Sequence, residues 1–160
     1  MDDKPRREAL ANSTLGQELE KSDCEILTTV MGVRQLNNDE TLVTEGENDN
    51  ALFVLIEGRL AVISNADIEE QVVYTMNTGE CAGTRAFIDR TPRKATLRAI
   101  GDTTVYTMEP EKFESLLDSH PKIVYKVMRT LFRLTHSNLM RMNLESQQLS
   151  NYINKKGGRY

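Results

Sequence analysis

The central part of the chain is built from short apolar runs that alternate with clusters of turn residues. Between residues 33 and 108 the runs occupy residues 41–44, 52–56, 60–63, 72–76, 95–100 and 105–108. The turn clusters lie at residues 37–39, 46–50, 57–58, 65–67, 77–79 and 101–102. Several short strands at this spacing predict an antiparallel sandwich, barrel or jelly roll rather than a fold in which strands and helices alternate.

Helical patterns flank the strands on both sides. Ser22 and Glu25 resemble a capping box, and apolar residues at helical spacing then predict a short helix that ends near Gly32. After the last strand a second short helix stops before Pro121, because proline is tolerated at a helix start but not inside it. Residues 121–156 contain no further proline or glycine and predict a helix about 50 Å long. The predicted fold is mainly β with α: an antiparallel β-roll or jelly roll with a short N-terminal helix and a long C-terminal helix.

The long helix carries two apolar stripes. One follows the three-and-four spacing of a coiled-coil seam, with seven apolar or aromatic residues among positions 125, 128, 132, 135, 139, 142, 146, 149 and 153. The other occupies a different face of the first half, at Val124, Val127, Leu131 and Leu134. We expect the second stripe to pack on the β-domain and the seam to meet a partner helix in a homodimer. The alternative is a monomer whose helix folds back on its own roll.

Composition narrows the class of protein. The net charge is -4, and 20 basic residues are scattered among 24 acidic ones, so direct binding to nucleic acid is not expected. No leader segment or membrane span is recognisable, which predicts a cytoplasmic protein without membrane contact. Cys24 and Cys81 are expected to be buried free thiols. Neither of the two histidines lies in the β region, so no metal site and no enzymatic activity is expected.

The segment 79–96 has the features of an anion-binding loop. Gly79 and Gly83 let the backbone approach a ligand closely, and a few helix-forming residues follow before Pro92 and Arg93. Amide groups at the start of a short helix attract an anion, and a fixed guanidinium adds a bidentate grip on phosphate oxygens. The pattern predicts that Arg93 binds a phosphate, although an arginine at this place is also compatible with a plain exposed charge.

These residues resemble the cyclic nucleotide-binding domain family, which includes the cyclic-AMP receptor protein and the regulatory subunits of protein kinase A. The similarity covers residues 22–150 and rests on the runs 42–49 and 52–60, on Gly79-Glu80, on Gly83, and on Pro92-Arg93-Lys94-Ala95-Thr96. It implies a β-roll at 22–120, a long helix at 121–156 that caps the pocket and dimerises, an N-terminal arm at 1–21 and a tail at 157–160. No function is assigned to the arm, which is expected to be loose or partly helical. The ligand-binding residues that the resemblance implies are Gly83, Thr84, Arg85, Ala86, Arg93, Lys94, Ala95, Thr96 and Asn138.

Three positions depart from the family pattern. Thr84 replaces the glutamate that, by resemblance, accepts a hydrogen bond from the ribose 2′-OH. A neutral hydrogen bond contributes about 1 kcal/mol and a charged one ~1.5–3 kcal/mol, so affinity is expected to fall by up to about thirtyfold. Arg85 stands at an apolar position, where it either helps to neutralise phosphate or points to solvent. Lys94 stands at the place of a small residue, where it adds charge or crowds the site.

Asn138 aligns with a residue that contacts the purine in this family. Its amide is suited to pair with a base edge, but an asparagine in a helical seam equally specifies register between partner helices. The resemblance therefore implies a regulatory sensor that binds cyclic AMP or cyclic GMP and signals through its C-terminal helix. We expect a stand-alone domain without a helix-turn-helix. The alternatives are a degenerate module that only dimerises or binds a partner, and a domain that binds another phosphorylated ligand.

Overall fold

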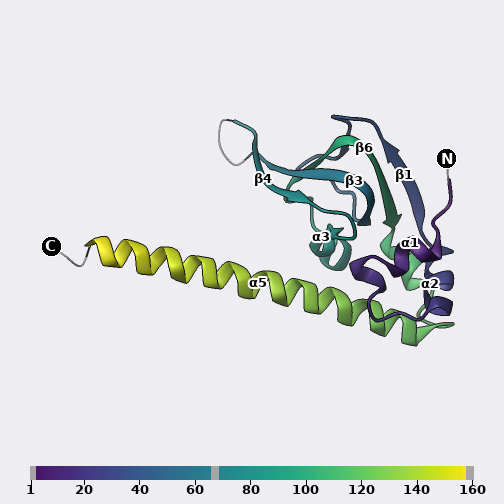
Figure 1. Cartoon of the computed structure of the whole chain (residues 1–160). Coiled ribbons are helices and arrows are strands. Elements are labelled where there is room, and N and C mark those ends of the chain that lie inside the picture. Colours follow the sequence, from purple (N-terminus) through teal and green to yellow (C-terminus); the bar gives the residue numbers. More distant parts are fainter. Residues whose placement is uncertain (1–2, 66–68, 158–160) are drawn as a thin grey trace.

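The computed structural model describes the backbone of residues 3–65 and 69–157, with the side chains of 3–65, 69–137, 140 and 144. A β-roll lies beside one long helix that runs along it and continues well past it (Figure 1). In chain order the elements are α1 (Arg7–Ala11), η1 (Thr14–Gly16), α2 (Lys21–Thr28), β1 (Gly32–Leu36), β2 (Thr41–Val43), β3 (Leu52–Ser64), β4 (Gln71–Met76), β5 (Cys81–Ala82), α3 (Thr84–Asp89), β6 (Thr96–Met108), α4 (Pro110–Glu114) and α5 (Pro121–Gly157).

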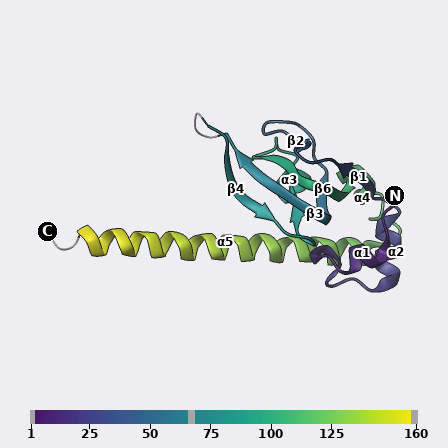
Figure 2. The ribbon, with the colours of Figure 1, turned by 45° about the horizontal axis from the view of Figure 1, so that its top comes forward.

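The strands form an antiparallel roll, which confirms the predicted fold class (Figure 2). Its strand order is β1-β6-β3-β4, while β2 pairs with β6 and β5 pairs with β3. Two clusters of buried apolar side chains divide the core. One fills the roll around Phe53, Leu60 and Val105, and the other lies where the roll meets the helices.

β3 and β6 are single strands of 13 residues each, although the sequence predicts two short strands in each of these segments. The expected turn residues Gly58 and Gly101 lie inside them with positive φ values of 86° and 73°. The β3–β6 register shifts on both sides of Glu57, so Gly58 forms part of a bulge. A Cβ at Gly58 would lie 2.5 Å from the Asp102 carbonyl oxygen, which explains why this bulge requires glycine. The glycines therefore bend continuous strands and do not end them.

α5 begins at Pro121 and continues to Gly157, as the sequence predicts. Its predicted packing stripe is confirmed, because Val124, Val127 and Leu131 are buried in the core cluster between roll and helices and Leu134 packs against it. Tyr125, Met128 and Phe132, on the seam side, are exposed. Among the described residues, no helix has the length and apolar character needed to cross a membrane.

The segment before α2 is packed more tightly than the expected arm. Leu10 of α1 and Leu15 of η1 are fully buried in the cluster that α5 also enters. The predicted cap of α2 is wrong: the reciprocal capping pair is Glu20 and Asp23, and the Glu20 amide donates to the Asp23 carboxylate over 3.0 Å. The helix starts earlier than predicted because this pair satisfies its first amide groups.

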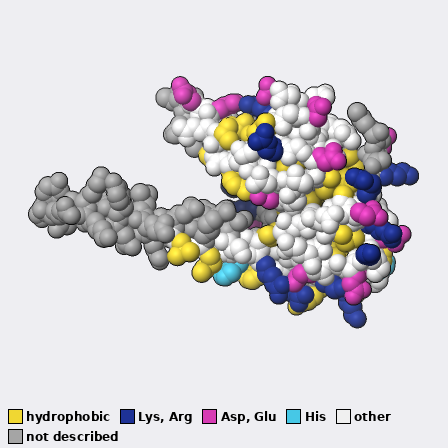
Figure 3. Space-filling model, in the orientation of Figure 1, with side chains coloured by type: hydrophobic (Ala, Val, Ile, Leu, Met, Phe, Trp, Pro, Cys, Tyr) yellow, Lys and Arg dark blue, Asp and Glu magenta, His cyan; other side chains and the backbone are white. Residues whose placement is uncertain are grey.

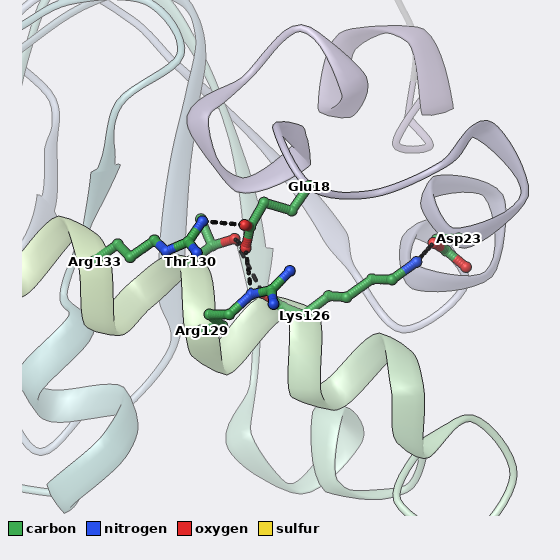
Figure 4. Close-up of polar contacts among 6 residues, drawn as sticks. All are labelled: Glu18, Asp23, Lys126, Arg129, Thr130 and Arg133. Atoms are coloured by element: carbon green, nitrogen blue, oxygen red, sulfur yellow. Dashed lines mark hydrogen bonds and ion pairs between the residues drawn. The ribbon is translucent and has the colours of Figure 1, made fainter.

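Polar contacts join this N-terminal segment to α5 (Figure 4). Arg129 Nε and Thr130 Oγ1 donate to one Glu18 oxygen over 3.1 and 3.0 Å, and Arg133 pairs with the other oxygen. Farther toward the start of α5, Lys126 Nζ lies 2.8 Å from Asp23 Oδ2. Residues more than 100 positions apart in the chain are thus joined by charge-assisted hydrogen bonds.

Candidate functional site

A cavity of about 610 Å³ lies between the roll and α5, and the space-filling view shows the surface hollowed there (Figure 3). This volume is within the range of about 300–1,000 Å³ that is usual for small-molecule sites. The loop that precedes α3, the first turn of α3 and the loop before β6 form one wall. The residues of these segments that line the cavity are Glu80, Cys81, Ala82, Gly83, Thr84, Arg85, Ala86, Pro92, Arg93, Lys94 and Ala95.

Arg93 is the buried cation of this site, with 5% of its surface exposed. Its Nη2 donates to the Ala51 carbonyl over 2.6 Å and to Asp49 Oδ1 over 3.2 Å. Its Nε and Nη1 are buried and have no hydrogen-bond partner among the described residues. Burial lowers the pKa of Arg93, and the charge of Asp49 opposes this shift. The group stays charged at neutral pH, because arginine is effectively always protonated in proteins.

The backbone and an aromatic ring fix the place of Arg93. Its amide donates to the Glu47 carbonyl over 2.9 Å, and its own carbonyl accepts from the Gly46 amide over 2.9 Å. The guanidinium carbon lies 4.7 Å from the centre of the Phe53 ring, within reach of a cation–π interaction. The Arg93 side chain is therefore already ordered before a ligand binds. Binding then costs less conformational entropy.

Gly83 brings the backbone against this guanidinium. It caps the N-terminus of α3 with a φ of 84°, in the left-handed region. A Cβ at this position would lie 2.2 Å from Arg93 Nη1, one of the two nitrogens without a partner. Glycine therefore satisfies both the backbone conformation and the space requirement here.

Seven of the nine predicted site residues line the cavity: Gly83, Thr84, Arg85, Ala86, Arg93, Lys94 and Ala95. Thr96 is not part of the lining. It is buried, and its hydroxyl accepts a hydrogen bond from the Glu45 amide over 2.9 Å, so it joins the loop between β2 and β3 to the start of β6. Asn138 lies on α5, but its side chain is outside the described residues.

Of the opposite walls, the family resemblance implied only α5, as the helix that caps the pocket. These walls come from four strands and from η1 and α5, which the fold brings together: Thr14, Val43, Val62, Tyr74, Met76, Leu97, Leu134 and Thr135. Tyr74 donates its hydroxyl to both Glu80 oxygens, over 2.7 and 2.9 Å. The alternation within each strand predicts inward-facing residues, but strand pairing decides which of them reach the cavity.

The two cysteines differ in their exposure. Cys24 is buried, whereas Cys81 is partly exposed in the cavity wall, contrary to the expectation that both are buried; both are free. Desolvation raises the pKa of Cys81 to about 12, which keeps it a thiol. Among the described residues, no group of His, Cys, Asp and Glu side chains is arranged to hold a metal ion.

The roll, the cavity and its buried arginine define a class of ligand-binding domain in which one long helix forms part of the pocket wall. The chain belongs to the cyclic nucleotide-binding domain family, whose model matches residues 33–120, more than half of its length. The resemblance stated from the sequence is thereby confirmed.

Solved structures share this fold. A cyclic nucleotide-binding domain from Methylobacillus flagellatus superposes with a TM-score of 0.79 at 21% identity, covering 84% of this chain and 79% of that one. The regulatory domain of Toxoplasma gondii PKA, crystallised with cAMP, gives a TM-score of 0.61 at 23% identity, covering 68% and 42% of the two chains.

Among curated proteins, a lysophospholipase of Aspergillus terreus is 30% identical over 98 residues. The match covers 61% of this chain and only 6% of that relative. The similarity is therefore confined to a small part of a much longer protein.

Proposed function

We propose that this chain is a regulatory sensor that binds a cyclic nucleotide, cyclic AMP or cyclic GMP, with the phosphate on Arg93. The observation that carries the proposal is the pair of buried, unpartnered nitrogens of Arg93 beside Gly83 in the cavity. A buried donor without an acceptor costs about 1–3 kcal/mol, and more when it is charged. An anionic ligand that accepts from both nitrogens removes this cost, so binding is favoured at this point of the cavity.

The remaining walls suit the rest of a nucleotide. Val43, Val62, Met76 and Leu97 offer apolar surface on which a base is able to pack. Thr84 lines the cavity and supplies a neutral hydroxyl for the ribose, in the place where the family has a carboxylate. The proposal therefore predicts that the protein interacts more weakly with the ribose than with the phosphate.

The signal is proposed to leave through α5. Leu134 and Thr135 of this helix line the same cavity as Arg93, so a bound ligand contacts the roll and the helix at once. If α5 can take two placements against the roll, a ligand that binds more tightly to one of them shifts the equilibrium toward that placement. The relative crystallised with cAMP is a PKA regulatory domain, which supports a regulatory role for this chain as well.

A homodimer through α5 is part of the proposal. Tyr125 and Phe132 are 63% and 71% exposed, and Figure 3 shows apolar side chains along the side of α5 that faces away from the roll. Sedimentation at micromolar concentration is expected to give twice the mass of the 18.2 kDa chain. A species with the mass of one chain would contradict the dimer and leave the binding proposal intact.

We propose the cytoplasm as the location of this chain, because cyclic nucleotides are found there.

Isothermal titration calorimetry with cyclic AMP and cyclic GMP tests the binding. We expect saturable heat for at least one ligand, and its loss in Arg93→Lys, which keeps the charge but not the guanidinium geometry. Arg59→Lys is the matched control, because Arg59 is exposed on β3 and does not line the cavity. Absence of heat at millimolar concentrations of both ligands would contradict the proposal and favour a module that only dimerises.

A further inference from the structure

Two further cations flank the buried arginine at the mouth of the cavity. Arg85 is the second residue of α3, and Lys94 directly follows Arg93 in the chain. Both line the cavity and both are exposed, whereas Arg93 is buried. The cavity therefore has one enclosed cation and two that are open to solvent.

Neither Arg85 nor Lys94 has an acidic partner among the residues that the structure describes. Arg90, at the other end of α3, shows the contrast, because it pairs with Glu111 at 2.5 Å and Glu114 at 2.7 Å. Arg93 itself has Asp49 at 3.2 Å. Arg85 and Lys94 thus form no ion pair within the described part of the fold.

The described lining residues of the cavity include three cations and a single carboxylate. Glu80 is the one carboxylate among the described lining residues, and both of its oxygens accept the Tyr74 hydroxyl. A single phosphate on the two free nitrogens of Arg93 leaves Arg85 and Lys94 without a counter-charge. A second phosphate at the mouth would meet two cations that need no rearrangement of an existing ion pair.

We infer that Arg85 and Lys94 form a second phosphate subsite, so the preferred ligand is a nucleotide that carries two phosphate groups. One phosphate binds Arg93 in the enclosed part of the cavity, and the other binds the two exposed cations at its mouth. This inference rests on the proposed function, since it places the first phosphate on Arg93. Two classes of ligand carry two phosphate groups in this way: cyclic dinucleotides and linear nucleoside bisphosphates.

Calorimetry on the full chain separates these ligands. The probes are cyclic di-AMP, cyclic di-GMP and adenosine 3′,5′-bisphosphate, compared with cyclic AMP and cyclic GMP. We expect at least one two-phosphate ligand to bind about tenfold more tightly than either cyclic mononucleotide, with a steeper loss of affinity as salt is raised. Which of them binds best identifies the class of ligand.

The variant Arg85→Gln/Lys94→Gln is expected to remove this preference, lowering the affinity for two-phosphate ligands more than that for cyclic AMP. Arg59→Gln, outside the cavity, is the control and is expected to change neither affinity. Circular dichroism checks that the double variant is folded.

The outcomes distinguish the two proposals. Arg93-dependent binding of cyclic mononucleotides without any preference for two phosphates would overturn the subsite and leave the proposed function intact. An undiminished preference in the double variant would also overturn the subsite. Binding of no nucleotide by the unmodified chain would overturn both. A preference that the double variant abolishes supports the subsite.

Discussion

Gly83 and Arg93 depend on each other at the centre of the cavity. The guanidinium occupies the space in which a side chain at position 83 would lie, and the positive φ at that position further excludes ordinary residues. Sequence reasoning identified both residues because they belong to one local segment. It could not place the guanidinium against Phe53 or Asp49, since those contacts depend on how β3 and its preceding loop pack.

A Gly83→Ala substitution tests this dependence. The added Cβ would displace Arg93 Nη1, which now lies 2.2 Å from that position, and the left-handed backbone adds strain of about 1–3 kcal/mol. We expect a lower melting temperature and a loss of ligand affinity of at least tenfold. Gly101→Ala is the control, because its φ of 73° also lies in the left-handed region, nothing lies within 4 Å of the added Cβ, and the residue does not line the cavity. Equal effects on binding in the two variants would contradict the argument.

Thr84 gives a second prediction at this scale. A Thr84→Glu variant restores the charged acceptor that the family resemblance associates with the ribose. Affinity for cyclic AMP is expected to rise by up to about thirtyfold, from the difference between neutral and charged hydrogen bonds. Affinity for 2′-deoxy cyclic AMP should not rise, because that analogue lacks the donor. Parallel titrations of both ligands check this, and an equal gain for both would count against a ribose contact.

The elements were predicted unequally well. α5 was predicted almost to its ends, because a proline starts it and no breaker interrupts it before Gly157. β3 and β6 were divided in the prediction, since a glycine that marks a turn and a glycine that forms a bulge look alike in sequence. The cavity walls from β2, β3, β4 and β6 could not be predicted, because they depend on contacts between distant elements, whereas the resemblance implied that α5 caps the pocket.

The two faces of α5 give a matched pair of variants. Leu131 is 1% exposed in the core, and Leu131→Ala is expected to lower the free energy of unfolding by about 2–5 kcal/mol. Phe132, its neighbour in sequence, is 71% exposed, so Phe132→Ala should change the stability of a monomer by less than about 0.5 kcal/mol. Urea denaturation measures both, and sedimentation of Phe132→Ala is expected to show a weakened dimer. A large stability loss in Phe132→Ala that persists on dilution to a monomer would contradict the assigned faces.

At the scale of the whole molecule, acidic residues near the N-terminus stabilise the docking of α5. The hydrogen bond from Lys126 lowers the pKa of Asp23, and desolvation opposes this. Burial also opposes the shift at Glu18, but hydrogen bonds from Arg129 and Thr130 lower its pKa overall. A carboxyl whose pKa is lower when folded stabilises the fold above its unfolded pKa, and this contribution disappears as the pH falls through the folded value.

The melting temperature is therefore expected to stay level from pH 7 to about pH 5 and to fall below about pH 4, near the ordinary pKa of Asp and Glu. In the Glu18→Gln/Asp23→Asn variant the stability at neutral pH should be lower and the acid-induced fall smaller. Thermal melts across this range check the prediction. An unchanged slope in the variant would show that other carboxyls control acid unfolding.

The length of α5 has a mechanical consequence. Its 37 residues extend over about 55 Å, and the part beyond Thr135 accounts for about 33 Å of this. A helix that is held at one end acts as a lever. With a rise of about 1.5 Å per residue, a tilt of about 10° at Thr135 moves the far end of the helix by roughly 6 Å. Under the proposed function, a ligand that tilts α5 by this angle where Leu134 and Thr135 line the cavity would therefore move the far end of the helix by several ångströms.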